Sequence, residues 1–182
     1  MSYLGTKPAN SPLTSELIPD GLIATSDLAN GAVTQDKLST YIAPKGTPAF
    51  SAYLGTNQTV TQSTWTKLNI NTEEFDTNSN YDTGNYRFTP TVAGYYQVNG
   101  GAYVINTNQT YNSLAIFKNG SIYKGSHSTS STGSYLISIS ALVYLNGSTD
   151  YIELYGQTTG GDPRFGASST QTYFQASMVR AA

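Results

Sequence analysis

Apolar and polar side chains alternate along most of the chain after residue 48, which is typical of strands with one buried face. The clearest case runs from 135 to 145, where every second position is apolar: Ile137, Ile139, Ala141, Val143 and Leu145. These odd-numbered side chains are expected to face a hydrophobic core.

Two later segments repeat the alternation. Ile152 and Leu154 alternate with Tyr151, Glu153 and Tyr155, and Phe174, Ala176 and Met178 alternate with Tyr173, Gln175, Ser177 and Val179. Further strands are expected at 50–54, 65–70, 86–89, 95–105, 111–117 and 121–124. No apolar stripe with helical spacing lies between them, so about eight to ten short strands predict an all-β sandwich or jelly roll.

The connections between these strands are of two kinds. Asn119-Gly120 and Asn146-Gly147 are tight-turn dipeptides, the strongest short-range signal for a hairpin. By contrast, 106–110, 125–133 and 156–170 read as long polar loops. If successive strands alternate in direction, the tight turns lie at one end of the sandwich and the long loops at the other, where binding residues are more often found.

Residues 1–47 follow a different pattern. A short motif with Thr, an acidic residue and Leu recurs every ten or eleven residues, at 14–17, 25–28 and 34–38. In each copy the Thr hydroxyl can cap a single helical turn while the Leu points to one side. A unit this short cannot bury its own apolar residues. The segment is therefore either a disordered linker or an extended stalk whose apolar residues are buried when several chains run side by side, and the repetition favours the stalk.

The composition excludes several classes of function. Only 11% of residues are charged, the formal net charge is -2, and no basic run is present, so we expect no nucleic-acid partner. The chain has no Cys, so stability has to come from packing or from subunit association. The first ten residues lack the apolar core of a signal peptide, and no stretch is long enough to insert into a membrane.

The sequence offers little chemistry for catalysis or metal binding. His127 is the single imidazole, and it falls in a Ser-rich segment read as a loop, a poor setting for a catalytic base. Glu73, Glu74, Asp76 and Asp82 lie close in sequence and could gather calcium, but they lack the spacing of a calcium loop and are equally well explained as solvated acids. We therefore expect no enzyme, no catalytic residue, no metal site and no cofactor.

Several segments of the second part resemble the globular head of complement C1q and its relatives in the tumour-necrosis-factor-like superfamily. The resemblance rests on residues 75–76, 80–82, 84–90 and 94–96, with further similarity at 48–52, 119–120, 145–152 and 173–179. It implies an antiparallel jelly roll of about ten strands that assembles as a homotrimer.

The first part is similar to the leader of phage tail-fibre and related virion appendage proteins, through residues 2–5, 20–21, 27–34 and 37–38. The two resemblances together imply a stalk and particle-docking segment at 1–47 and a head at 48–182. The resulting hypothesis is a non-enzymatic trimeric phage fibre, located on the virion tail or neck and assembled in the host cytoplasm without a signal peptide. Its partners would be other virion proteins and a host surface glycan or protein.

Two other functions stay open at this point. The chain is alternatively a purely structural neck or capsid-decorating fibre without a dedicated receptor. A bacterial adhesin or spore-surface protein with the same head is a third, more distant class.

The candidate site residues follow from loop position and strand parity. From the three long loops we expect receptor contacts at Asn106, Asn108, Tyr111, His127, Gln157, Asp162 and Arg164. Tyrosines on the strand face opposite the aliphatic core suit a subunit interface, and they predict trimer contacts at Tyr151, Tyr155 and Tyr173. The alternative for each tyrosine is ordinary exposure on a sheet surface.

Overall fold

A computed structural model describes residues 24–33, 47–105, 111–129 and 133–182 of the chain. The chain divides into two compact units, Met1–Pro44 and Lys45–Ala182. In the first unit, the described residues contain one turn of 3-10 helix, η2 (Thr25–Asp27). Its first turn is closed by Asp27, whose carboxylate accepts a hydrogen bond from the Ala24 amide at 2.9 Å. The other two copies of the repeated motif, and most of the predicted stalk, lie outside the described residues.

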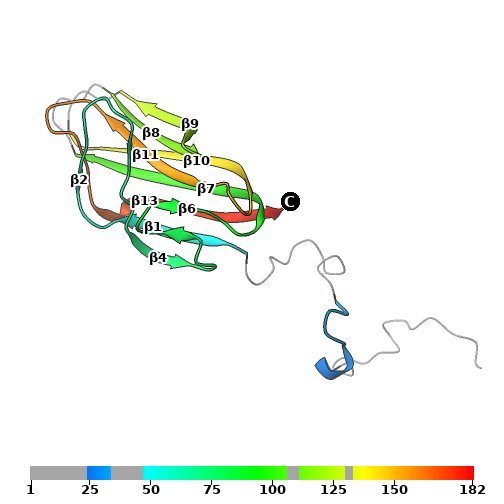
Figure 1. The fold of residues 1–182 in the computed structure, drawn as a ribbon. Helices are drawn as coiled ribbons and strands as arrows, with labels where there is room; N and C mark the ends of the chain where they lie inside the picture. The colour runs from blue at the N-terminus through cyan, green and yellow to red at the C-terminus, as the bar shows by residue number, and fades with distance from the viewer. Residues whose placement is uncertain (1–23, 34–46, 106–110, 130–132) are drawn as a thin grey trace, which may run out of the picture. The chain divides into compact units, whose positions relative to one another are not determined.

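The second unit is an all-β jelly-roll sandwich, as predicted (Figure 1). Its described residues form thirteen strands: β1 (Ala49–Leu54), β2 (Gln58–Thr59), β3 (Thr66–Lys67), β4 (Thr72–Asp76), β5 (Tyr81–Asp82), β6 (Arg87–Phe88), β7 (Ala93–Ile105), β8 (Asn112–Lys118), β9 (Ser121–Ser128), β10 (Tyr135–Asn146), β11 (Ile152–Thr158), β12 (Arg164–Phe165) and β13 (Ser168–Ala181). The number exceeds the predicted ten because β2, β3, β5, β6 and β12 are strands of only two residues.

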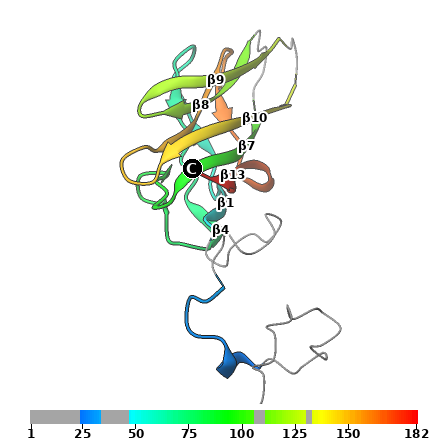
Figure 2. The same cartoon turned by 90° about the vertical axis from the view of Figure 1, so that its right-hand side faces the viewer.

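The strands form two antiparallel sheets. Sheet I has the order β2-β12-β7-β13-β1-β4, with β10 paired to β7. Figure 2 shows β10, β7, β13, β1 and β4 side by side in this order. Sheet II has the order β5-β6-β11-β8-β9, with β3 paired to β11. Neighbours that are far apart in sequence, such as β1 and β13, make the topology non-local.

The core lies between the two sheets and follows the predicted parity. All five odd-numbered apolar side chains of β10 are buried, as are Ile152, Leu154, Phe174 and Ala176. At its centre Phe50 stacks on Tyr81 and on Phe88, each with ring centroids 4.5 Å apart, and meets Phe174 edge-on at 5.2 Å. These rings come from both sheets, so they fix the sheets against each other through a large apolar contact area.

The sheets approach closely where one side chain is missing. Gly100 on β7 faces Leu154 of β11, and a Cβ built at this glycine would lie 2.6 Å from a Leu154 methyl carbon. A side chain here would have to push the two sheets apart, because backbone and core are already in contact.

Candidate functional site

One end of the sandwich, called here the turn end, carries both Asn-Gly dipeptides. Asn119 and Gly120 have φ values of 51° and 78°, and they join β8 to β9 where Lys118 pairs with Ser121. Two successive positive φ angles define the tight hairpin turn that matches strand twist. The hairpin predicted at this position is therefore confirmed.

The second dipeptide is not in a hairpin, so the prediction made from Asn146-Gly147 is wrong. β10 pairs with β7 in sheet I, whereas β11 pairs with β8 in sheet II, so the segment between β10 and β11 crosses from one sheet to the other. The Asn146 side-chain oxygen accepts hydrogen bonds from the amides of Ser148, Thr149 and Asp150 at 3.0, 3.0 and 2.9 Å. The Asn-Gly pair thus forms a compact crossover here, because the Asn side chain accepts the hydrogen bonds that a neighbouring strand would otherwise accept.

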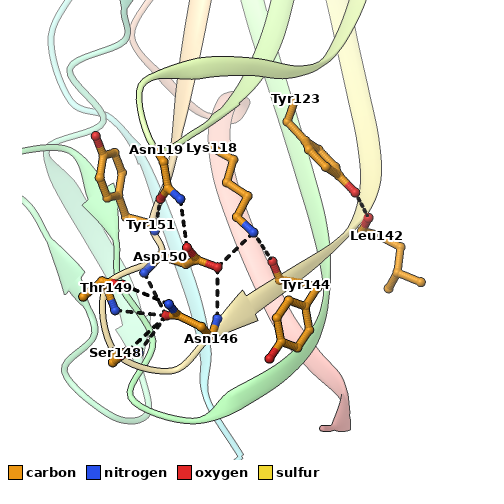
Figure 3. A network of polar contacts seen from close by, with 10 residues as sticks. All are labelled: Lys118, Asn119, Tyr123, Leu142, Tyr144, Asn146, Ser148, Thr149, Asp150 and Tyr151. Carbon is orange, nitrogen blue, oxygen red and sulfur yellow. Dashed lines mark hydrogen bonds and ion pairs between the residues drawn. The ribbon is translucent and has the colours of Figure 1, made fainter.

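A polar network connects the hairpin to the crossover (Figure 3). The Lys118 ammonium forms an ion pair with Asp150 at 2.9 Å and donates to the Tyr144 carbonyl at 2.7 Å. The Asn119 side chain donates to Asp150 at 2.8 Å and accepts from the Tyr151 amide at 3.0 Å. The hydrogen bond from Asn119, followed by the contact with Lys118, lowers the pKa of Asp150 below its ordinary value. The network holds the two sheets together at this end.

The opposite end, called here the loop end, contains more strand than the sequence predicts. β9 continues to Ser128 and β11 to Thr158, both paired with β8, while Arg164 belongs to β12. The long loops predicted at 125–133 and 156–170 are therefore wrong in part. His127 and Gln157 lie on strands, because backbone pairing with β8 extends into polar and glycine-containing sequence.

Three predicted receptor residues come together near the loop end. Ser113 of β8 pairs with Gln157 on one side and with His127 on the other, and the Tyr111 ring stacks on the His127 ring with centroids 5.9 Å apart. Asp162 and Arg164 form a separate, more exposed ion pair at 2.6 Å. Asn106 and Asn108 lie outside the described residues.

The predicted interface tyrosines do not share a surface. Tyr155 lies on β11 in sheet II and Tyr151 directly precedes that strand, whereas Tyr173 lies on β13 in sheet I. The Tyr155 ring stacks on Phe117 at 3.8 Å, and the Arg87 guanidinium lies 3.7 Å above the centre of the Tyr151 ring. Both sheet II tyrosines are therefore already packed within the single chain.

A buried carboxylate that sequence reasoning missed lies between these two tyrosines. Glu153 is only 2% exposed, and one of its oxygens accepts from the Lys67 ammonium at 3.0 Å and from the Arg87 guanidinium at 2.9 Å. Burial, followed by the charge of Glu153, raises the pKa of Tyr155. Lys67 and Arg87 are far from Glu153 in sequence, so no local pattern indicates that they pair with it. Alternation placed Glu153 on an outward face and gave no sign that it is buried.

The outward face of sheet I is different, because large side chains are left uncovered there. Tyr95, Leu142, Tyr144 and Val179 are all exposed, and the Tyr95 and Tyr144 rings lie 5.4 Å apart. A shallow hollow of about 620 Å³ lies at this patch and is lined by Tyr95, Leu142, Val179, Arg180, Ala181 and Ala182. Further along the same face, four polar residues lie side by side on adjacent strands: Ser51, Gln175, Asn99 and Ser140.

Three of the four acidic residues considered for calcium accept hydrogen bonds from groups of the same chain. Asp76 accepts from the Tyr81 amide at 2.6 Å, Asp82 from the Asn85 amide at 3.0 Å, and Glu74 from the Ser51 hydroxyl at 2.7 Å. Among the described residues, no three His, Asp or Glu side chains gather in the way that a cation site needs. In the same part of the chain, no helix has the length and apolar character that a bilayer crossing requires.

Known proteins match this chain in structure but not in sequence. No protein-family model matches the chain, and no curated protein does. Solved structures do match. The globular domain of zebrafish complement 1qA has 16% identity and a TM-score of 0.56, with coverage of 74% of this chain and 99% of that one. The Eiger TNF of S. frugiperda has 11% identity and a TM-score of 0.60, covering 75% and 95% of the two chains.

A third match is murine APRIL, with 7% identity and a TM-score of 0.57 over 72% of this chain and 98% of that chain. The three proteins are covered almost completely, and the part of this chain that they match corresponds in extent to the sandwich unit. The head of this protein therefore has the C1q- and TNF-like jelly-roll fold.

Proposed function

We propose that three copies of the chain assemble through the outward face of sheet I. The observation that carries this proposal is the uncovered patch of Tyr95, Leu142, Tyr144 and Val179. Contiguous apolar surface of this kind is uncommon on a monomer and usually marks an interface. Tyr151 and Tyr155 of sheet II offer no comparable patch, because Arg87 and Phe117 already cover them. The fold shared with C1q and TNF heads supports a threefold arrangement.

A matched pair of substitutions tests this interface. Leu142 on sheet I and Ile122 on sheet II are 52% and 53% exposed in the single chain. Leu142→Asp places a charge in the interface and should convert the assembly into single subunits that stay folded, whereas Ile122→Asp should leave the assembly intact. Equal behaviour of the two variants in light-scattering mass measurements would show that the face is not an interface.

The assembled protein acts, in this proposal, as a phage fibre on the virion tail or neck. The leader-like residues 1–47 dock onto particle proteins, and the head binds a host surface ligand, a saccharide in the simplest case. The support is the pairing of a fibre-type leader with a head whose loop end displays Tyr111, His127 and Gln157. The proposal takes the head as a binding domain rather than an enzyme. It is supported by the stacking of His127 on Tyr111 and by the use of Asp76 and Asp82 as acceptors for nearby backbone amides.

The fibre function is tested on particles and on cells. Purified full-length protein in excess should reduce adsorption of the parent particle to its host, and antibody labelling should place the chain on a projecting appendage. Labelling on an appendage without any competition for adsorption would favour the purely structural fibre. A chain absent from particles would remove the proposal altogether.

A further inference from the structure

Three adjacent strands of sheet II present one row of side chains near the loop end. Gln157 of β11 pairs with Ser113 of β8, and Ser113 pairs with His127 of β9. Leu114 and Ile116 of β8 point into the core, so Ser113 belongs to the opposite, outward side. Tyr111, just before β8, joins this side through its stacking on His127. The row therefore combines an amide, a hydroxyl and two rings on one side of the sheet.

The hydroxyl in the middle of this row has no partner. Ser113 is 2% exposed, and its Oγ makes no hydrogen bond within the described residues. A buried hydroxyl without a partner loses its hydration without compensation, so it is retained at a cost in stability. Such a group is explained if a ligand supplies the missing hydrogen bond.

Gln157 and His127, the neighbours of Ser113, each make a contact with another part of the chain. The Gln157 amide nitrogen donates to the Ser63 carbonyl at 2.6 Å, which leaves its side-chain oxygen available as an acceptor. The Tyr111 and His127 rings are inclined by only 27° and form a nearly continuous aromatic surface, of which His127 is the exposed part. Rings held in this way present a flat apolar platform at small cost in side-chain entropy.

We propose that this row is a binding site for a neutral pyranose. The ring C–H groups of the sugar would stack on His127, its hydroxyls would donate to the Gln157 oxygen, and one hydroxyl would form a hydrogen bond with the Ser113 Oγ after a small shift of the side chains that cover it. The row itself contains no Lys, Arg, Asp or Glu, and the nearest carboxylate on β11, Glu153, is neutralised by Lys67 and Arg87. The chemistry therefore favours an uncharged ligand. The inference rests on the proposed function, since it names the ligand class and the surface of the host-binding head.

The test uses the full-length protein and four probes: the methyl pyranosides of glucose, galactose, mannose and N-acetylglucosamine. Titration of isotope-labelled protein should give saturable NMR shifts with at least one probe, confined to the amides of Tyr111, Ser113, His127 and Gln157 and their neighbours. No saturable shift with any probe, or shifts on sheet I instead, would overturn the proposal.

Variants separate a binding role from a structural one. Ser113→Ala should weaken binding of the active probe about fivefold, the effect of one lost hydrogen bond, without lowering stability in the absence of sugar. His127→Ala should weaken binding about tenfold through the lost platform. Ser126→Ala, at the β9 position that pairs with the core residue Leu114, is the matched control and should bind like the parent protein. Unchanged affinity in both site variants contradicts the proposal.

The two hypotheses fail in different ways. If the parent protein competes for adsorption to the host and Ser113→Ala and His127→Ala compete equally well, the fibre function stands and this site is wrong. If the pyranoside binds at the row but the protein does not compete for adsorption, the site stands and the fibre function is wrong.

Discussion

Two tyrosines of sheet II and two of sheet I are packed in opposite ways. On sheet II, Tyr151 lies beneath Arg87, and Tyr155 stacks on Phe117 beside the buried Glu153. On sheet I, Tyr95 and Tyr144 contact each other and remain more than one third exposed. A face whose aromatic side chains are satisfied within one chain needs no partner, whereas a face that leaves them uncovered does.

The comparison predicts the largest energetic effect on sheet II. Glu153→Gln removes the shared partner of Lys67 and Arg87, whose side chains are 29% and 35% exposed. The free energy of unfolding should fall by about 2–3 kcal/mol, less than for a fully buried pair because both cations can reach water. Denaturant unfolding measures this loss, and the assembled mass should not change.

Glu74→Gln is the control for that substitution, because Glu74 is an exposed carboxylate on sheet I with a single contact from Ser51. Its effect should stay within about 0.5 kcal/mol. Equal losses in the two variants would contradict the difference drawn between the faces.

A labelling experiment sharpens the comparison without any mutation. Tyr95, Tyr144 and Tyr123 have similar exposure in the single chain, 43%, 41% and 38%, but Tyr123 lies on β9 in sheet II. In the assembled protein, tetranitromethane should nitrate Tyr123 several-fold faster than the two sheet I tyrosines, because the interface covers them. Peptide mass spectrometry gives the rates, and comparable nitration of all three tyrosines would argue against burial of sheet I.

The smallest effect is expected at the turn end and depends on pH. Because the folded protein lowers the pKa of Asp150 below its ordinary value of 3.8, its contacts stabilise the fold above that value and lose their effect as pH falls through the folded pKa. Asp150→Asn should therefore cost roughly 1 kcal/mol at neutral pH and nothing once the parent carboxyl is protonated. Unfolding curves from pH 7 down to a pH at which the parent carboxyl is protonated measure the difference. An equal cost over this whole range would assign the effect to packing.

Much of the fold could be predicted from local pattern. Alternation identified the buried side of β10 and β13, because a strand with one solvated face repeats every two residues. The Asn119-Gly120 turn was identified for the same reason, since its backbone angles depend on those two residues alone.

What the sequence could not reveal depends on distant partners. Asn146-Gly147 has the same dipeptide, but the pairing of β10 with β7 makes it a crossover. The ends of β9 and β11 read as loops because their glycine, serine and histidine residues have weak strand preference until β8 pairs with them. Parity put Tyr151, Tyr155 and Tyr173 on faces opposite the core, but it could not tell which sheet each tyrosine occupies.

The mass of the full-length protein in solution tests the central claim most directly. Sedimentation equilibrium at micromolar concentration should give three times the mass of the 19.5 kDa chain, because the uncovered side chains of sheet I need a partner. A folded protein that sediments as one chain under the same conditions would contradict the account.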